Sequence, residues 1–168
     1  MTTNYRDTLN LPETQFSMKA GLPQKEPEIL NFWNQNDIYK KIREKYSDSE
    51  LFLLHDGPPY ANGAIHLGHS VNKILKDITI KYKTLKGFNA PFIPGWDCHG
   101  LPIELNVEKK HGKNSELVQD KESFQKACKE YAETQINNQM EGFKRLGVFG
   151  DWENSYKSLD SSFEAEII

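Results

Sequence analysis

The stretch from residue 51 to residue 69 constrains the fold more than any other part of the sequence. An apolar run, residues 51–54, stops at the breaker sequence Asp-Gly-Pro-Pro, residues 56–59, and helical periodicity follows. A short run without polar interruptions is typical of a strand that is buried on both faces, as in a parallel sheet. We therefore expect a strand, a loop and a long helix in this order, which is how a βαβ unit begins.

The expected helix carries its apolar side chains in one stripe. The stripe recurs at i, i+3, i+4, i+7, i+11 and i+14 and comprises Val71, Ile74, Leu75, Ile78, Tyr82 and Leu85. Gly87 then stands where a glycine ends a helix, and residues 89–93 form a second short strand pattern. A single βαβ unit leaves sheet edges and helix faces without partners. The sequence thus predicts an α/β fold and, more narrowly, the first portion of a larger α/β domain.

We divide the chain into an N-terminal arm and helix, residues 1–46, and a domain of residues 47–168. The arm is polar and is expected to be extended as far as residue 25. A helical pattern then starts at Pro27 and reaches Tyr46. A second long helix is expected late in the domain. Its buried face is predicted to carry Phe124, Cys128, Tyr131, Ile136, Met140 and Phe143.

Composition points away from a membrane protein and from a general nucleic-acid binder. The formal net charge is −3 with 27% charged residues, which demands no nucleic-acid partner. No apolar run approaches the length of a membrane span. Cys98 and Cys128 lack CxxC spacing, which suits a reducing compartment. We expect a soluble, cytoplasmic protein without a membrane partner.

Two histidines flank a glycine where the loop meets the helix, in the sequence His66-Leu-Gly68-His69. In open α/β sheets, ligands bind at the carboxyl ends of the strands, where the amides of a helix N-terminus favour a phosphate. His66 and His69 both project from the first helical turn, so both can donate hydrogen bonds to a triphosphate. Gly68 lets an adenine ring approach the backbone. Taken alone, the pattern also fits two ordinary surface histidines or two metal ligands that await a carboxylate.

The longer context resembles the class I aminoacyl-tRNA synthetases, in the form found in the isoleucyl family. The sequence DGPPYANGAIHLGH, residues 56–69, is similar to the HIGH signature of that class. The motif proper comprises Pro59, Tyr60, Ala61, Asn62, Gly63, Ala64, Ile65, His66, Leu67, Gly68 and His69. Residues 94–104, PGWDCHGLPIE, resemble the isoleucyl block more than the valyl PGTDHAG type or the leucyl GWDAFGLPAE type. Residues 145–152, RLGVFGDW, resemble the segment that precedes the editing insertion.

The resemblance implies roles for individual residues. The residues implied to bind ATP are His66, Gly68 and His69, with the two histidines as the catalytic pair. Gly57 would present its backbone carbonyl to the ammonium group of the amino acid, and Pro58 would offer an apolar surface to its side chain. Asp97 would hold the same ammonium, since a cation in a partly dry pocket requires a carboxylate.

The same resemblance implies that the complete protein activates L-isoleucine with ATP and Mg²⁺ and transfers it to tRNA(Ile). Catalysis would rest on positioning and charge stabilisation, with no side chain as nucleophile. No KMSKS-like lysine loop occurs in the sequence, so residues 1–168 are expected to be an inactive N-terminal fragment of a Rossmann-like catalytic domain. We expect a monomer when full length and no zinc site within this chain. The alternatives are a nucleotidylyltransferase-like enzyme and a non-catalytic ATP-binding fragment.

Other residues receive structural interpretations. Five lysines along the expected helix are predicted to form a solvated face, with tRNA contact as the alternative: Lys73, Lys76, Lys81, Lys83 and Lys86. Trp96 and Cys98 are expected to pack beneath their loop, and His111 is expected in solvent. The side chains of His99 and Glu104 receive no role from the sequence.

Overall fold

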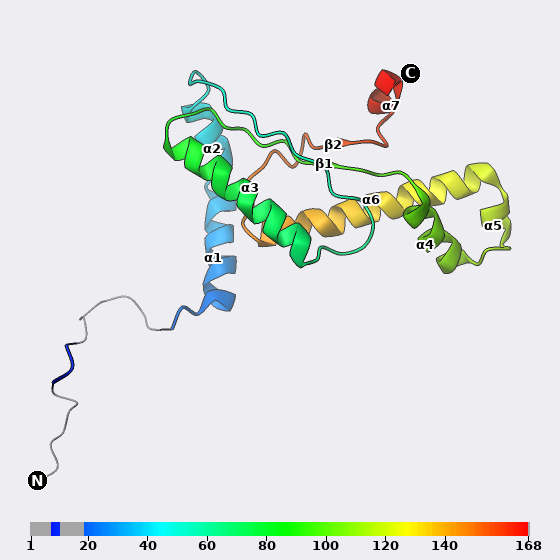
Figure 1. The fold of residues 1–168 in the computed structure, drawn as a ribbon, viewed down its shortest axis with the longest axis horizontal. Coiled ribbons are helices and arrows are strands. Elements are labelled where there is room, and N and C mark those ends of the chain that lie inside the picture. The colour runs from blue at the N-terminus through cyan, green and yellow to red at the C-terminus, as the bar shows by residue number, and fades with distance from the viewer. Residues whose placement is uncertain (1–7, 11–18, 168) are drawn as a thin grey trace, which may run out of the picture.

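The computed structural model describes residues 8–10 and 19–167. Its helices and strands are, in chain order, α1 Leu22–Gln35, α2 Ile38–Lys45, α3 Leu67–Leu85, β1 Gly95–Trp96, α4 Leu101–His111, α5 Glu116–Gln119, α6 Lys121–Arg145, β2 Tyr156–Lys157 and α7 Ser161–Ile167. The molecule is elongated, with α1 and α2 at one end, α4 and α5 at the other, and α6 running between them (Figure 1). Within the described residues, no helix combines the length and the apolar character that crossing a membrane requires.

The N-terminal region becomes helical earlier than the sequence predicts. Most of the predicted extended arm lies outside the described residues, and α1 already begins at Leu22. Pro23 occupies the first turn of α1, where its missing N–H costs no hydrogen bond. The single helix predicted as far as Tyr46 is two helices, because Asp37 adopts a left-handed φ of 50° between them. A short polar side chain such as aspartate tolerates that conformation better than most residues.

The predicted βαβ unit is present in outline, but its strands are shorter than expected. Residues 51–54 and 89–93 meet in a single parallel bridge between Leu51 and Asn89. The continuous ladder is the parallel pair of β1 and β2, with Gly95 opposite Tyr156 and Trp96 opposite Lys157. A ladder needs a neighbouring strand along its whole length, and the described part of the chain supplies one only there. The α/β prediction is therefore confirmed only in part: the chain is mostly helical, with a small parallel sheet.

The apolar core lies where α6 packs against the segments around β1. Trp96 and Phe92 are almost completely buried and share a cluster with Ile136 and Phe143 of α6. These two α6 residues are buried as predicted. The other four predicted members are half-buried: Phe124, Cys128, Tyr131 and Met140. The packing roles predicted for Trp96 and Cys98 are confirmed, since both side chains are buried.

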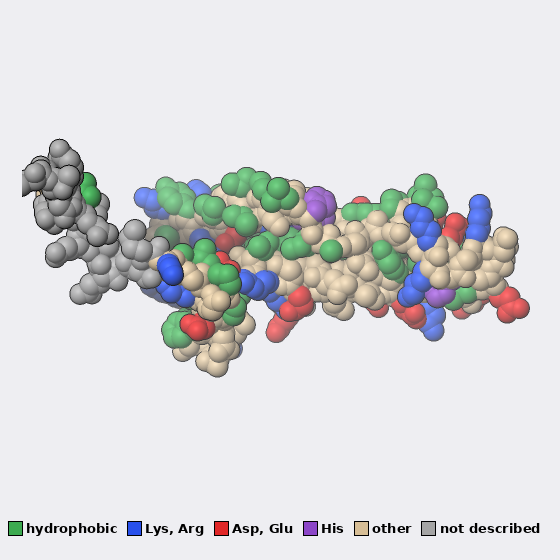
Figure 2. All heavy atoms as spheres, turned by 90° about the horizontal axis from the view of Figure 1, so that it is seen from below, with side chains coloured by type: hydrophobic (Ala, Val, Ile, Leu, Met, Phe, Trp, Pro, Cys, Tyr) green, Lys and Arg blue, Asp and Glu red, His purple; other side chains and the backbone are tan. Residues whose placement is uncertain are grey.

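The face that α3 presents to the core is opposite to the predicted one. Its buried residues are Lys73, Asp77, Ile80 and Thr84. The predicted apolar stripe is exposed, from 38% at Ile74 to 84% at Leu85, and hydrophobic side chains form a row on the surface of the molecule (Figure 2). Periodicity identifies the residues that share a face, but not the direction in which that face points. The end of α3 is as predicted, with Gly87 at a φ of 94°.

Candidate functional site

The two histidines of the HLGH sequence cap the N-terminus of α3 with their own rings. The Nδ1 atom of His66, the N-cap residue, accepts hydrogen bonds from the amides of Gly68 at 3.1 Å and of His69 at 3.4 Å. The Nδ1 atom of His69 in turn accepts one from the amide of His66 at 3.3 Å. These reciprocal bonds form a capping box built from two imidazoles. The amides of residues 68 and 69, which the sequence suggested for a phosphate, are therefore already engaged.

The capping arrangement itself requires a glycine at position 68. A Cβ atom at position 68 would lie 3.0 Å from Cε1 and 3.1 Å from Nδ1 of the His66 ring. That approach is closer than ordinary van der Waals contact, so a side chain would push the ring away from its cap. The glycine thus makes room for His66 itself, a reason that the motif pattern did not reveal.

The capping bonds also indicate which ring nitrogen of each histidine carries the proton. An Nδ1 atom that accepts a hydrogen bond carries no proton, so we assign the Nε2–H tautomer to His66 and to His69. The rings stack with centroids 3.8 Å apart and planes 19° from parallel, which two positively charged rings would oppose. Burial lowers the pKa of His69, and the neighbouring His66 and Lys73 lower it further. The pair therefore offers two Nε2–H donors to a ligand.

The loop before α3 lies against the segment that follows β1. Tyr60 and Asp97 form a parallel bridge, in which Ala61 donates its amide to the Asp97 carbonyl at 2.7 Å and Asp97 donates its amide to the Pro59 carbonyl at 3.0 Å. The Tyr60 hydroxyl also donates to the carbonyl of His99. The segments that the resemblance assigns to ATP and to the amino acid are thus joined directly.

A hollow of about 240 Å³ opens where this loop meets α3. Its lining comprises Gly57, Pro59, Gly68, His69, Asn72 and Lys73. Three residues with a predicted ligand role therefore meet at one place, Gly57, Gly68 and His69, together with the motif residue Pro59. The residues with a predicted ligand role that lie outside this lining are Pro58, His66 and Asp97, all of which are exposed. The hollow brings residues from both predicted subsites within reach of a single ligand.

A buried carboxylate ties the start of the loop to α3. Asp56, whose side chain is completely buried, forms ion pairs with Lys73 and Lys76, and we call these three residues the Asp56 triad. The Nζ atom of Lys73 also lies over the rings of Phe92 and Phe143, 5.4 and 5.5 Å from their centroids. Burial lowers the pKa of Lys73, and the hydrogen bond to Asp56 opposes that shift. Because two ammonium groups share one carboxylate, the triad leaves a net positive charge beside the hollow.

The solvated lysine face predicted along α3 is wrong for most of its members. The residues that depart from it most are Lys73, Lys76 and Lys81. Lys81 donates to the Asp77 carboxylate at 2.5 Å and to the Gly147 carbonyl at 2.9 Å. Lys83 is half-buried over aromatic rings, and Lys86 is exposed as predicted. The hydrogen-bond partners of these lysines lie up to 66 residues away in the sequence, where helical periodicity cannot detect them.

Sequence reasoning also missed what holds the middle of the motif loop. The Asn62 side-chain carbonyl accepts hydrogen bonds from Asn106 on α4 at 2.7 Å and from the Tyr131 hydroxyl on α6 at 2.9 Å. The sequence did offer one signal, the pair Asn62-Gly63, which is typical of a turn. In the structure Gly63 has a φ of 79°, as such a turn requires. Two helices outside the motif therefore anchor this loop.

The remaining candidate residues lie away from the hollow. His99 is exposed, with Nε2 3.0 Å from the Ser158 carbonyl oxygen and 3.5 Å from the Glu164 carboxylate. Glu104 is exposed, and His111 is exposed as predicted. Across residues 8–10 and 19–167, no group of three or more His, Cys, Asp or Glu side chains is placed to hold a metal ion.

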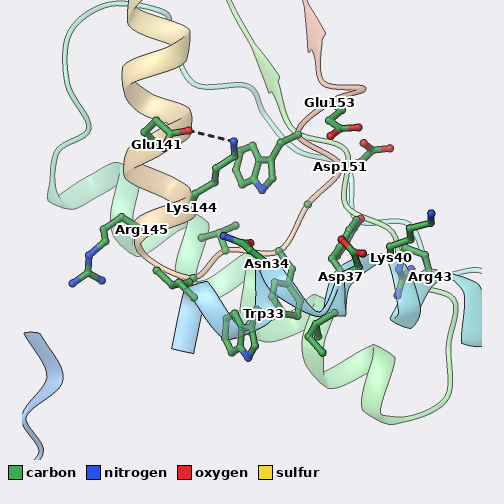
Figure 3. Close-up of a pocket in the computed structure, with 18 residues that line it drawn as sticks. Trp33, Asn34, Asp37, Lys40, Arg43, Glu141, Lys144, Arg145, Asp151 and Glu153 are labelled. Carbon is green, nitrogen blue, oxygen red and sulfur yellow. Dashed lines mark hydrogen bonds and ion pairs between the residues drawn. The ribbon is translucent and has the colours of Figure 1, made fainter. Parts of the chain in front are cut away.

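A larger hollow, of about 820 Å³, lies away from residues 56–69 and 94–104 but is lined by most of the third segment, residues 145–152. It opens between α1, α2, the C-terminal end of α6 and residues 147–153 (Figure 3). Its charged lining comprises Lys40, Arg43, Lys144, Arg145, Asp37, Glu141, Asp151 and Glu153. Lys144 already pairs with Glu141 at 3.2 Å, and Arg145 pairs with Glu26 at 2.9 Å. This mixture of charges favours no class of ligand, so we place the candidate site at the smaller hollow.

The chain resembles known proteins over nearly its whole length. The family model described as tRNA synthetases class I (I, L, M and V) matches residues 28–168. The isoleucine–tRNA ligase of Francisella philomiragia is 59% identical over 166 residues, and that of Francisella tularensis subsp. novicida is 60% identical over 166 residues. Both matches cover 99% of this chain and 18% of the relative, so the chain spans 18% of the length of these curated relatives.

A solved structure shares the fold. The chain is similar to the LeuRS in the LeuRS–tRNA–LeuAMS ternary complex of Agrobacterium radiobacter K84, with a TM-score of 0.65 and 20% sequence identity. The match covers 86% of this chain and 16% of that one. At this identity the likeness concerns the fold alone.

Proposed function

This chain belongs to the class I tRNA synthetases (I, L, M and V), and from that premise we propose that it is part of an isoleucine–tRNA ligase. The observation that carries the proposal is its 59% to 60% identity to isoleucine–tRNA ligases across 99% of the chain. The complete protein would join the carboxylate of L-isoleucine to the α-phosphate of ATP with release of pyrophosphate, and would then pass the isoleucyl group to tRNA(Ile) with release of AMP. Residues 1–46 would be an N-terminal extension, and residues 47–168 would be the first part of a Rossmann-like catalytic domain.

On the nucleotide side, we assign His66 and His69 to the phosphates of ATP. Their Nε2–H groups can donate hydrogen bonds that strengthen as negative charge builds on the leaving pyrophosphate. The net positive charge of the Asp56 triad lies beside the same hollow and favours an anionic ligand. Gly68 offers a stretch of backbone without a side chain, on which an adenine ring can rest. Mg²⁺ would enter as the counter-ion of the triphosphate.

On the amino-acid side, we assign Gly57, Pro58 and Asp97. The carboxylate of Asp97 would pair with the substrate's ammonium group, and the Gly57 carbonyl would accept a hydrogen bond from it. The Pro58 ring would contact the aliphatic side chain. Gly57 lines the same hollow as His69, which supports a common meeting point for isoleucine and the phosphates.

The rest of the complete protein would finish the site. Helix α3 of this chain exposes six large apolar side chains in a row, and soluble proteins rarely leave such a patch uncovered. We propose that another part of the complete protein packs on this face and that a KMSKS-type loop supplies further phosphate contacts. The complete protein would act as a cytoplasmic monomer, with tRNA(Ile) as its macromolecular partner.

Amino-acid-dependent ATP–pyrophosphate exchange by the complete protein tests this function. We expect exchange with isoleucine, weaker exchange with valine and only background exchange with leucine. The D97N variant should raise the KM for isoleucine, whereas the exposed-site control D48N should leave it unchanged. Exchange driven by leucine or valine but not by isoleucine would contradict the specificity. Robust exchange by residues 1–168 alone would contradict the need for the rest of the protein.

A further inference from the structure

Gln139 is a polar side chain in the middle of the apolar core. It lies on α6 between Ile136 and Phe143 and is completely buried. Burying a carboxamide costs free energy unless hydrogen bonds replace those lost to water. Its position therefore requires an explanation beyond packing.

All the hydrogen-bonding groups of this carboxamide are directed at the two motif segments. Nε2 donates to the backbone carbonyls of Tyr60 and Gly63, both at 2.9 Å. Oε1 accepts a hydrogen bond from the indole Nε1–H of Trp96 at 3.0 Å. One side chain thus joins three points that lie 43 to 79 residues away from it in the sequence.

These three points border the residues assigned to catalysis. Gly63 stands three positions before His66, and Trp96 is the residue immediately before Asp97. The long helix that carries Gln139 runs past both segments (Figure 1). The backbone bridge between Tyr60 and Asp97 pairs the two segments at a single point. Gln139 joins them at further points, because it binds Gly63 on one segment and Trp96 on the other.

We propose that Gln139 is a positioning residue for adenylate formation, a role that rests on the proposed function. It holds the motif loop by two carbonyls, and through that loop it sets the position of His66 and His69. Its third bond, to Trp96, places the Asp97 segment against the same carboxamide. The relative position of the nucleotide and amino-acid subsites therefore depends on a residue outside both motifs.

Replacing Gln139 by methionine isolates the hydrogen bonds from the packing. Methionine has a similar length and fits an apolar core, but it leaves the carbonyls of Tyr60 and Gly63 and the indole of Trp96 without this partner. A loop freed in this way can shift, and a displacement of roughly 1 Å in an active site can cost on the order of 100-fold in rate. Gln135 provides the matched control, because it is a half-buried glutamine about one turn earlier on the same helix.

The test compares Q139M and Q135M in the complete protein at a temperature below unfolding. We expect Q139M to lower kcat for isoleucine-dependent ATP–pyrophosphate exchange by roughly 10- to 100-fold, with the KM for isoleucine within about twofold of wild type. Hydrogen exchange at residues 60–66 should become faster in Q139M. Q135M should leave the kinetics and the loop exchange unchanged. W96F, which removes one of the three bonds, should lower kcat less than Q139M does.

A loss of stability without a change in kinetics or hydrogen exchange would assign Gln139 to packing alone. If folded Q139M loses stability but keeps the wild-type kcat and loop exchange, the positioning role is wrong. Should Q139M fail to fold, Q139N keeps the amide one methylene short of its partners, and wild-type kinetics in that variant would overturn the role equally. If the wild-type protein shows no isoleucine-dependent exchange, the proposed function fails. In that case, the comparison of hydrogen exchange at residues 60–66 between Q139M and Q135M still decides whether Gln139 holds the loop.

Discussion

The two long faces of α3 reverse the usual division between the inside and the outside of a protein. One face buries Lys73, Asp77 and Thr84 beside a single isoleucine, Ile80. The opposite face exposes Val71, Ile74, Leu75, Ile78, Tyr82 and Leu85. Apolar side chains scattered singly on a surface need no explanation, but a buried charged row opposite a continuous apolar row does. The polar face therefore serves internal geometry, and the apolar face is the one for which we propose a covering segment in the complete protein.

The buried charges of α3 have partners on neighbouring segments. Lys73 pairs with Asp56 at the start of the motif loop. Asp77 accepts the Lys81 ammonium at 2.5 Å and the Phe149 amide at 2.8 Å. Buried ion pairs of this kind add little stability compared with apolar packing, but the loss of one partner is costly. They fix α3 against the loop that precedes it and against the turn after α6.

The largest effect should follow from removing the shared carboxylate of the polar face. In D56N, the buried ammonium of Lys73 loses its charged partner and remains next to Lys76. Uncompensated burial of a charge costs roughly 3–5 kcal/mol. We expect a decrease of that size in the free energy of unfolding of residues 1–168, measured by urea denaturation.

The control for D56N is D48N, which makes the same change at an exposed carboxylate. It should alter the free energy of unfolding by less than about 0.5 kcal/mol. K76M should lower the free energy of unfolding less than D56N does, because the buried ion pair between Asp56 and Lys73 remains in that variant. Equal losses in D56N and D48N would mean that the polar face is not held by the triad.

Helix α3 also shows which features could be predicted from the sequence and which could not. The N-terminus of α3 at His66 and its end before Gly87 could be predicted, because caps and glycines act locally. The inward direction of Lys73 could not, because it depends on a carboxylate 17 residues earlier and on an aromatic core assembled from distant segments. For the same reason, the anchoring of the motif loop by Gln139 left no trace in either motif.

A smaller effect on the free energy of unfolding is expected from pH, through His69 in the first turn of α3. Burial, His66 and Lys73 lower the pKa of His69 below its ordinary value of 6.5 in the folded protein. The unfolded chain therefore binds more protons as the pH falls below 6.5, so the free energy of unfolding should decrease there and stay unaffected by His69 above it. Urea denaturation at about pH 7.5 and about pH 5.5 measures this loss.

The H69Q variant separates this titration from the capping. Glutamine at this third helical position can still accept the His66 amide, as in an ordinary capping box, but it does not titrate. We expect H69Q to lose less stability than wild type between the two pH values. H111Q, at an exposed histidine, should behave like wild type. A wild-type loss that persists in full in H69Q would assign the pH dependence to another group.

The smallest effect is expected from Ile78 on the apolar face, and Ile80 on the buried face is its matched comparison. Ile80 is 2% exposed and Ile78 is 57% exposed, although they stand two positions apart on the same helix. In residues 1–168, I80A should cost about 2–5 kcal/mol because it leaves a cavity. I78A should change the free energy of unfolding by less than about 0.5 kcal/mol, since alanine removes little buried surface there and favours the helix.

In the complete protein, a segment that covers the stripe would make I78A lower the midpoint of thermal inactivation as I80A does. An I78A variant that is harmless in both settings would show that the stripe stays in solvent, and the proposal of a covering segment would then be wrong.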